Sequence, residues 1–146
     1  MPSVEILSEQ DGVKRVPFDT TVCSFNMTVC GLVVAFYSSQ QCVQAIHLPA
    51  LDTESLYYEN FKQIMINNRP DKILIFTLDI TTMFNNDDKC VESYYTNARI
   101  ISEYCPHNTH YYVAPENCNG TIYIYIDSQG NLPKLADSFK KIDFYI

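Results

Sequence analysis

The chain has 146 residues, a formal net charge of −7, and a composition that is 47 % hydrophobic and 18 % charged. This length suits one domain with a substantial core, and the hydrophobic content excludes disorder over most of the chain. No apolar stretch approaches the ~20 residues that a membrane-spanning helix needs, and the acidic balance argues against binding to nucleic-acid phosphates. We therefore expect a single domain over residues 1–146, with no membrane span and no nucleic-acid partner.

The first third of the chain predicts short strands. Residues 4–7 indicate an edge strand that a turn at Asp11–Gly12 ends, and residues 20–25 indicate a second strand. Residues 29–37 form an unbroken apolar run, which is typical of a strand covered on both faces. Residues 42–48 predict its partner strand, in a hairpin with a loop of about four residues.

An amphipathic helix is expected next. Asp52 or Thr53 can cap its first turn, and Asn68-Arg69-Pro70 ends it. Its apolar stripe is expected to contain Leu56, Tyr57, Phe61, Ile64 and Met65. Residues 72–78 predict the strand that follows.

A second helix is predicted over residues 89–104, because apolar residues recur there at steps of three and four and Pro106 stops the pattern. The recurring residues are Cys90, Tyr94, Ala98, Ile101 and Cys105. Residues 110–113 and 121–127 predict two further strands, and the tail after Pro133 predicts a short helix or strand. The fold class expected is α+β, with α/β as the alternative: a mixed β-sheet or β-sandwich with two main helices packed outside.

Six cysteines suggest a disulfide framework at first sight. The first residues lack the basic and apolar regions of a secretory signal, however, and most cysteines lie inside apolar runs. The chain has no C-x-x-C pair, and none of its three histidines completes a zinc-finger spacing. We therefore expect mostly reduced, buried cysteines, no bound metal and no cofactor.

One cysteine has a partner that the predicted hairpin can supply. Cys30 opens the apolar strand and His47 ends the strand paired with it, so the two side chains can come within hydrogen-bonding range. A thiol nucleophile needs such a base and a group that orients the base. His107 and His110 lie in a polar segment and are expected to be exposed. On spacing alone, a core cysteine beside a strand-end histidine remains the alternative.

The surrounding residues carry a family resemblance. The stretch Ser24-Phe-Asn-Met-Thr-Val-Cys30-Gly-Leu-Val-Val-Ala-Phe-Tyr37, with His47-Leu48-Pro49 seventeen residues after the cysteine, resembles the CheD family of chemoreceptor glutamine deamidases. That family has a threonine six residues before its cysteine, where this chain has Ser24. The likeness covers roughly residues 4–132 and includes Met83-Phe84, Asn97-Ala98, Asn119-Gly120-Thr121 and Asp127 to Gly130. A similar Cys-His core occurs in toxins of the cytotoxic necrotizing factor type.

The resemblance implies a protein glutamine deamidase. Cys30 would be the nucleophile, His47 the general acid and base, and Ser24 the group that orients the imidazole. Backbone N–H groups near Val29 and Cys30 would stabilise the oxyanion. No cofactor or metal is implied. The partner implied is a protein that carries an exposed glutamine, and a regulatory protein is a second partner that the resemblance allows.

Departures from the family pattern indicate a different target. The family's Gly-Leu-Gly-Ser loop is replaced by Asn26-Met27-Thr28-Val29, and its later glycine pairs fall near Gln44-Ala45 and Asp79-Ile80. A reshaped substrate rim predicts a target other than chemoreceptors. The alternatives are a catalytically inactive CheD-like protein-interaction module with an acidic, tyrosine-rich face, and a thiol protease or transglutaminase-like enzyme. A working thiolate needs a reducing environment, so we expect the cytosol, either the cell's own or that of an invaded host.

Overall fold

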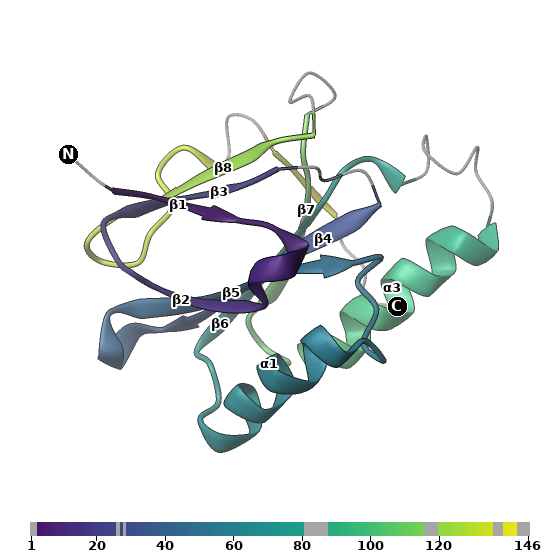
Figure 1. Cartoon of the computed structure of the whole chain (residues 1–146), viewed down its shortest axis with the longest axis horizontal. Coiled ribbons are helices and arrows are strands. Elements are labelled where there is room, and N and C mark those ends of the chain that lie inside the picture. Colours follow the sequence, from purple (N-terminus) through teal and green to yellow (C-terminus); the bar gives the residue numbers. More distant parts are fainter. Residues whose placement is uncertain are drawn as a thin grey trace.

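The computed structural model describes residues 3–25, 27, 29–80, 88–115, 120–135 and 139–142. Within these residues, nine strands form two mixed sheets and two α-helices pack on the larger sheet, which confirms the expected α+β class (Figure 1). The resemblance also drew on Met83-Phe84, which lies outside the described residues, as does Cys118. No helix in the described part of the chain is long and apolar enough to cross a membrane.

The smaller sheet has three strands in the order β1-β3-β8. Strand β1 (Ser3–Leu7) is its edge, as predicted, and pairs in parallel with β3 (Thr20–Ser24). Strand β8 (Ile122–Ile126) runs antiparallel to β3 on the other side. The register places Leu7 beside Ser24 and Ser24 beside Ile122, so three segments meet at one end of this sheet.

The larger sheet has six strands in the order β2-β5-β4-β6-β7-β9. Their bounds are β2 (Val13–Pro17), β4 (Cys30–Tyr37), β5 (Cys42–Pro49), β6 (Lys72–Thr77), β7 (Thr109–Val113) and β9 (Lys140–Ile142). Neighbouring strands are antiparallel except for the parallel pair β6–β7. Edge strand β2 was not expected, because Val16 is its only fully buried residue and the charged pair Lys14-Arg15 hides its alternation.

The predicted hairpin is confirmed. Strands β4 and β5 pair over their full lengths, and a 3₁₀ turn, η2 (Ser38–Gln40), joins them. Every residue of β4 is buried, because one face of the strand packs against the smaller sheet and the other against the helices. A strand covered on both faces reads as a continuous apolar run, as this one does.

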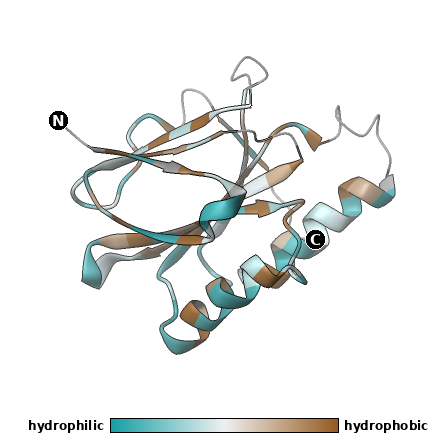
Figure 2. Ribbon diagram, in the orientation of Figure 1, coloured by the Kyte–Doolittle hydropathy of each residue, from teal (hydrophilic) through white to brown (hydrophobic). Residues whose placement is uncertain are grey.

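Two cores therefore lie on opposite faces of the larger sheet. The inter-sheet core contains Cys30, Leu32, Val34 and Phe36 of β4, together with Val22, Ile122 and Ile124 of the smaller sheet. The helix-side core contains Val33, Ala35 and Tyr37 of β4, with Tyr58, Phe61, Met65, Tyr94, Ala98 and Ile101 of the helices. Figure 2 shows the resulting bands of hydrophobic residues along the strands and helices.

Helix α1 (Leu56–Asn67) begins slightly later than predicted. Its N-cap is Ser55, whose hydroxyl accepts a hydrogen bond from the N–H of Tyr57 at 3.1 Å. The expected cap Asp52 accepts instead from the N–H of Glu54 in the preceding turn. The expected stripe is also partly wrong. Leu56 is 89 % exposed and Tyr57 41 % exposed, since the buried face is set by Tyr58, Phe61 and Met65.

Helix α3 (Asp88–Ser102) matches the predicted second helix closely. Tyr94, Ala98 and Ile101 are buried as expected. Cys90 is only half-buried, and Cys105 lies beyond the last helical residue, in the turn before β7. The helix ends at Ser102, whose hydroxyl donates to the carbonyl of Arg99 at 2.6 Å.

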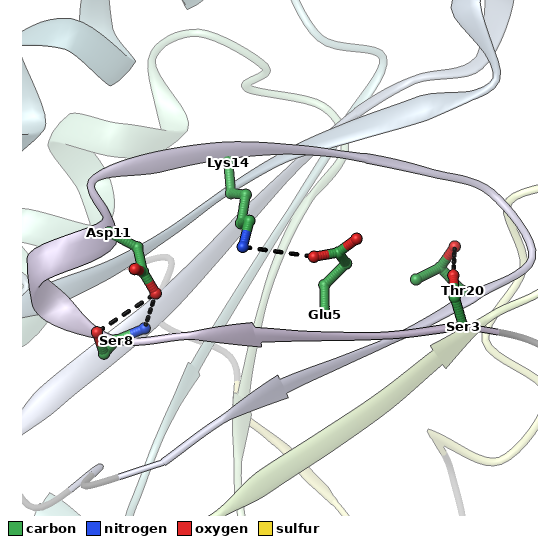
Figure 3. Close-up of polar contacts among 6 residues, drawn as sticks. All are labelled: Ser3, Glu5, Ser8, Asp11, Lys14 and Thr20. Carbon is green, nitrogen blue, oxygen red and sulfur yellow. Dashed lines mark hydrogen bonds and ion pairs between the residues drawn. The ribbon is translucent and has the colours of Figure 1, made fainter.

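The link between β1 and β2 joins the two sheets (Figure 3). A short 3₁₀ turn, η1 (Glu9–Asp11), follows β1, and the N–H of Ser8 donates to the carboxylate of Asp11 at 2.7 Å. Lys14 on β2 then reaches back to Glu5 on β1, with Nζ and the carboxylate oxygen 3.4 Å apart. These contacts hold the end of β1, and with it the carbonyl of Leu7, against the larger sheet.

Candidate functional site

A buried histidine and a buried serine meet between the two sheets. Ser24 is the last residue of β3, and His47 is the third-last residue of β5. The hydroxyl of Ser24 lies 2.9 Å from Nδ1 of His47, within hydrogen-bonding distance. Their exposed fractions are 0 % and 2 %. The two sheets thus bring together residues that lie 23 positions apart in the chain.

Cys30 lies on the same face of the larger sheet as His47. His47 is paired with Leu32 and Cys30 with Pro49, and side chains two residues apart on a strand share a face. The thiol and the imidazole are therefore diagonal neighbours, not directly opposite as the hairpin argument implied. Diagonal neighbours lie about 7–8 Å apart at Cβ or somewhat less, which an imidazole ring can span.

Three groups lie within hydrogen-bonding distance of the Ser24 hydroxyl, which has only one hydrogen to donate. Besides His47, it lies 3.2 Å from the carbonyl oxygen of Leu7 and 3.4 Å from the sulfur of Met27. The carbonyl and the thioether can only accept. If the hydroxyl of Ser24 donates to the carbonyl of Leu7, it accepts from Nδ1–H of His47, and both of these hydrogen bonds are then made. That assignment leaves Nε2 of His47 unprotonated, in the tautomer that a general base requires.

Two of the groups that surround Ser24, the carbonyl of Leu7 and the side chain of Met27, could not be predicted from the sequence. Leu7 contributes a backbone carbonyl, which no side-chain pattern can reveal. Met27 is fully buried, and its N–H donates to the carbonyl of Gly120 at 2.9 Å. That bond connects the segment between β3 and β4 to the segment just before β8, because Gly120 lies two residues before Ile122, the first residue of that strand.

The peptide before Cys30 is held by two donors. The carbonyl of Val29 accepts from the N–H of Ala50 at 2.9 Å and also from the hydroxyl of Tyr94, on α3. Tyr94 is 3 % exposed, and the sequence indicated only that it packs in the core. The pKa of Tyr94 is raised to about 12, first by burial and then by the negative charge that a Cys30 thiolate places near it. Tyr94 therefore stays protonated, and able to donate, at neutral pH.

The expected oxyanion donors, the backbone N–H groups of Val29 and Cys30, lie at the start of β4. Cys30 is buried, with 6 % of its surface exposed, whereas the Val29 side chain is 44 % exposed beside it. Pairing between β4 and β6 starts at Gly31, opposite Thr77, so Cys30 lies one residue beyond the β4–β6 ladder. The proposed role of the Val29 and Cys30 amides remains a prediction.

Neither Cys23 nor Cys42 packs beneath the candidate pair. Cys23 precedes Ser24 on β3 and so points to the opposite face, where it pairs with Tyr123 of β8. Cys42 lies at the far end of β5 in the helix-side core, and its sulfur accepts from Nε of Arg15 at 3.3 Å. Among the described cysteines, none forms a disulfide bond: Cys23, Cys30, Cys42, Cys90 and Cys105.

The other two histidines lie elsewhere. His107 is exposed, as expected. His110 was also expected to be exposed but is half-buried, because it lies on β7; its Nε2 lies 2.8 Å from the side-chain oxygen of Asn108, and burial lowers its pKa. Among the described residues, no group of three or more His, Cys, Asp or Glu side chains gathers in a way that could hold a metal ion.

Comparison of the chain with family models, with curated proteins and with solved structures gave no match. The likeness to the CheD family is therefore carried by the motif residues alone.

Proposed function

We propose that the chain is a CheD-like protein glutamine deamidase, a single domain over residues 1–146 in which Cys30 is the nucleophile. The observation that carries this proposal is the buried hydrogen bond, 2.9 Å long, between Ser24 and Nδ1 of His47. It supplies the third member that a Cys-His pair needs, a group that fixes the tautomer and orientation of the imidazole. The shared face of Cys30 and His47 is consistent with the same assignment.

The first half of the reaction is acylation. Nε2 of His47 takes the proton of the Cys30 thiol, and the thiolate attacks the carboxamide carbon of a glutamine side chain. The resulting tetrahedral oxyanion is stabilised by backbone N–H groups near Val29 and Cys30. The carbon–nitrogen bond then breaks, and the proton held by His47 passes to the leaving nitrogen. Ammonia departs and a thioester remains on Cys30.

The second half is hydrolysis of that thioester. His47 accepts a proton from water as the water oxygen attacks the thioester carbon. The carbon–sulfur bond breaks, the product is a glutamate side chain, and the proton on His47 returns to the thiolate. A thiol protease or a transglutaminase-like enzyme would share the first step and differ in the bond attacked or in the acceptor.

The target is proposed to be a protein other than a chemoreceptor. The residues that replace the family's glycine loop include Val29, which is 44 % exposed next to the buried thiol. An apolar side chain at that position changes the surface that a target protein meets. A thiol nucleophile also requires a reducing compartment, for which we propose the cytosol of the cell or of an invaded host.

The test is product analysis with candidate target proteins. Incubation with the unmodified protein is expected to add ~1 Da at a glutamine, since an amide nitrogen is exchanged for oxygen, and to release ammonia. Cys30→Ala should abolish both signals, whereas Cys90→Ala, on helix α3, should leave them unchanged. Peptide cleavage or cross-linking in place of the mass gain would indicate the protease or transglutaminase alternative. A mass gain that survives Cys30→Ala would refute the proposal.

A second candidate is a CheD-like interaction module without turnover. The burial of Cys30, at 6 % exposed, favours it, because a substrate must reach the sulfur for chemistry to occur. In that case Cys30→Ala would leave partner binding intact and Cys30 would be inert towards thiol reagents.

A further inference from the structure

We propose that Tyr94 is a positioning residue for the oxyanion site: by holding the carbonyl of Val29, it aims the N–H of Cys30 at the oxygen bonded to the carbon that the thiolate attacks. This inference rests on the proposed function of Cys30 as a nucleophile. It assigns a role in the reaction to a helix residue whose sequence position indicates only core packing.

The geometry of one peptide unit carries the inference. The C=O of Val29 and the N–H of Cys30 belong to the same planar, trans peptide, so they point in opposite directions. Whatever fixes the carbonyl therefore fixes the N–H. Two donors, the N–H of Ala50 and the hydroxyl of Tyr94, bind this carbonyl from the side of β5 and α3. The N–H of Cys30 consequently points the other way, towards the β6 side of β4.

Tyr94 is suited to act as such an anchor. Its ring is packed in the helix-side core beside Ala98 and Ile101, and only 3 % of its surface is exposed. A rigid aromatic ring loses little entropy when its hydroxyl is held in place, and preorganised donors cost no rearrangement during the reaction. Tyr94 thereby connects helix α3 to Val29, the residue that immediately precedes β4.

The experiment compares two reactions of one thiol. Iodoacetamide alkylates Cys30 by direct displacement of iodide, which creates no oxyanion. p-Nitrophenyl acetate acylates it through a tetrahedral oxyanion: the sulfur–carbon bond forms, nitrophenolate leaves, and the thiol proton passes to His47 and then to water. Both rates are measured on the whole chain by mass mapping of the peptide that contains Cys30.

Tyr94→Phe keeps the ring and removes the hydroxyl. A direct oxyanion donor is worth about 10²–10³ in rate, so the loss of one of its two anchors should slow acylation about tenfold. The alkylation rate should stay within about twofold, because the thiolate itself is unaffected. Tyr58→Phe is the matched control: Tyr58 is buried in the same core, and its hydroxyl has no hydrogen-bond partner in the part of the chain described. It should change neither rate.

The outcomes separate the two proposals. Equal slowing of acylation and alkylation, or no slowing of either, would overturn the role of Tyr94 while leaving Cys30 a nucleophile. If Cys30 of the unmodified protein reacts with neither reagent faster than Cys90 does, the proposed function fails, and the role of Tyr94 fails with it.

Discussion

One hydroxyl group, that of Ser24, joins the three segments from which the candidate site is built. It contacts the end of β1 through Leu7, the segment before β4 through Met27, and β5 through His47. All of these partners are buried, so none can exchange its bond for one with water. Removing the hydroxyl would take a hydrogen-bond partner from the buried carbonyl of Leu7 and from the imidazole of His47, which costs more than the bond itself contributes.

Ser24→Ala is therefore expected to lower the free energy of unfolding by about 1–3 kcal/mol. Thr20→Val is the matched control, because Thr20 is a buried residue on the same face of β3. Within the described part of the chain its hydroxyl makes only long contacts, 3.4 Å to Ser3 and 3.5 Å to the carbonyl of Phe18. It should cost less than Ser24→Ala. Urea denaturation of both variants measures the difference, and a smaller effect for Ser24→Ala than for the control would contradict the central place given to this hydroxyl.

At the scale of elements, the hairpin β4–β5 depends on a close contact beside Cys30. After β5, Ala50 and Leu51 adopt positive φ values of 54° and 52°, and this turn folds Leu51 back over Gly31. A Cβ on Gly31 would lie 2.1 Å from Cδ2 and 2.7 Å from Cγ of Leu51. The glycine next to Cys30 is thus required by the close approach of Leu51, which is itself fully buried.

Gly31→Ala should consequently destabilise the fold by about 1–3 kcal/mol through overpacking. In a Leu51→Ala background the same change should cost less than half as much, since the clashing atoms are gone. Leu51→Ala alone is expected to lower the free energy of unfolding by about 2–5 kcal/mol. The unmodified protein, the two single variants and the double variant are therefore compared by urea denaturation at low temperature, where the destabilised variants stay folded in the absence of urea. Additive effects would show that Leu51 is not what excludes a side chain at position 31.

At the scale of the whole molecule, the sequence predicted most strands, both helices and the α+β class, because each strand pattern and helix period is local. The edge strand β2 was missed, since only Val16 is fully buried there. The apolar Leu56 was misplaced, because the buried face of α1 is decided by the sheet it packs on.

The candidate site was likewise predicted only in part. Cys30 and His47 could be proposed from a hairpin and a spacing, and Ser24 from the family resemblance. The diagonal relation of Cys30 to His47 required the strand register, and the contacts from Leu7 and Tyr94 required the packing of distant elements. Backbone groups and core residues give no sequence signal of a role in a site.

The central claim, that Cys30 is an activated thiol, is tested most directly by its alkylation rate. Cys30 is 6 % exposed and Cys90 half-buried, so accessibility alone predicts faster reaction at Cys90. With iodoacetamide at pH 7, we predict that Cys30 reacts about tenfold faster than Cys90, and that His47→Gln removes this advantage. A Cys30 that reacts no faster than Cys90 in the unmodified protein would contradict the claim.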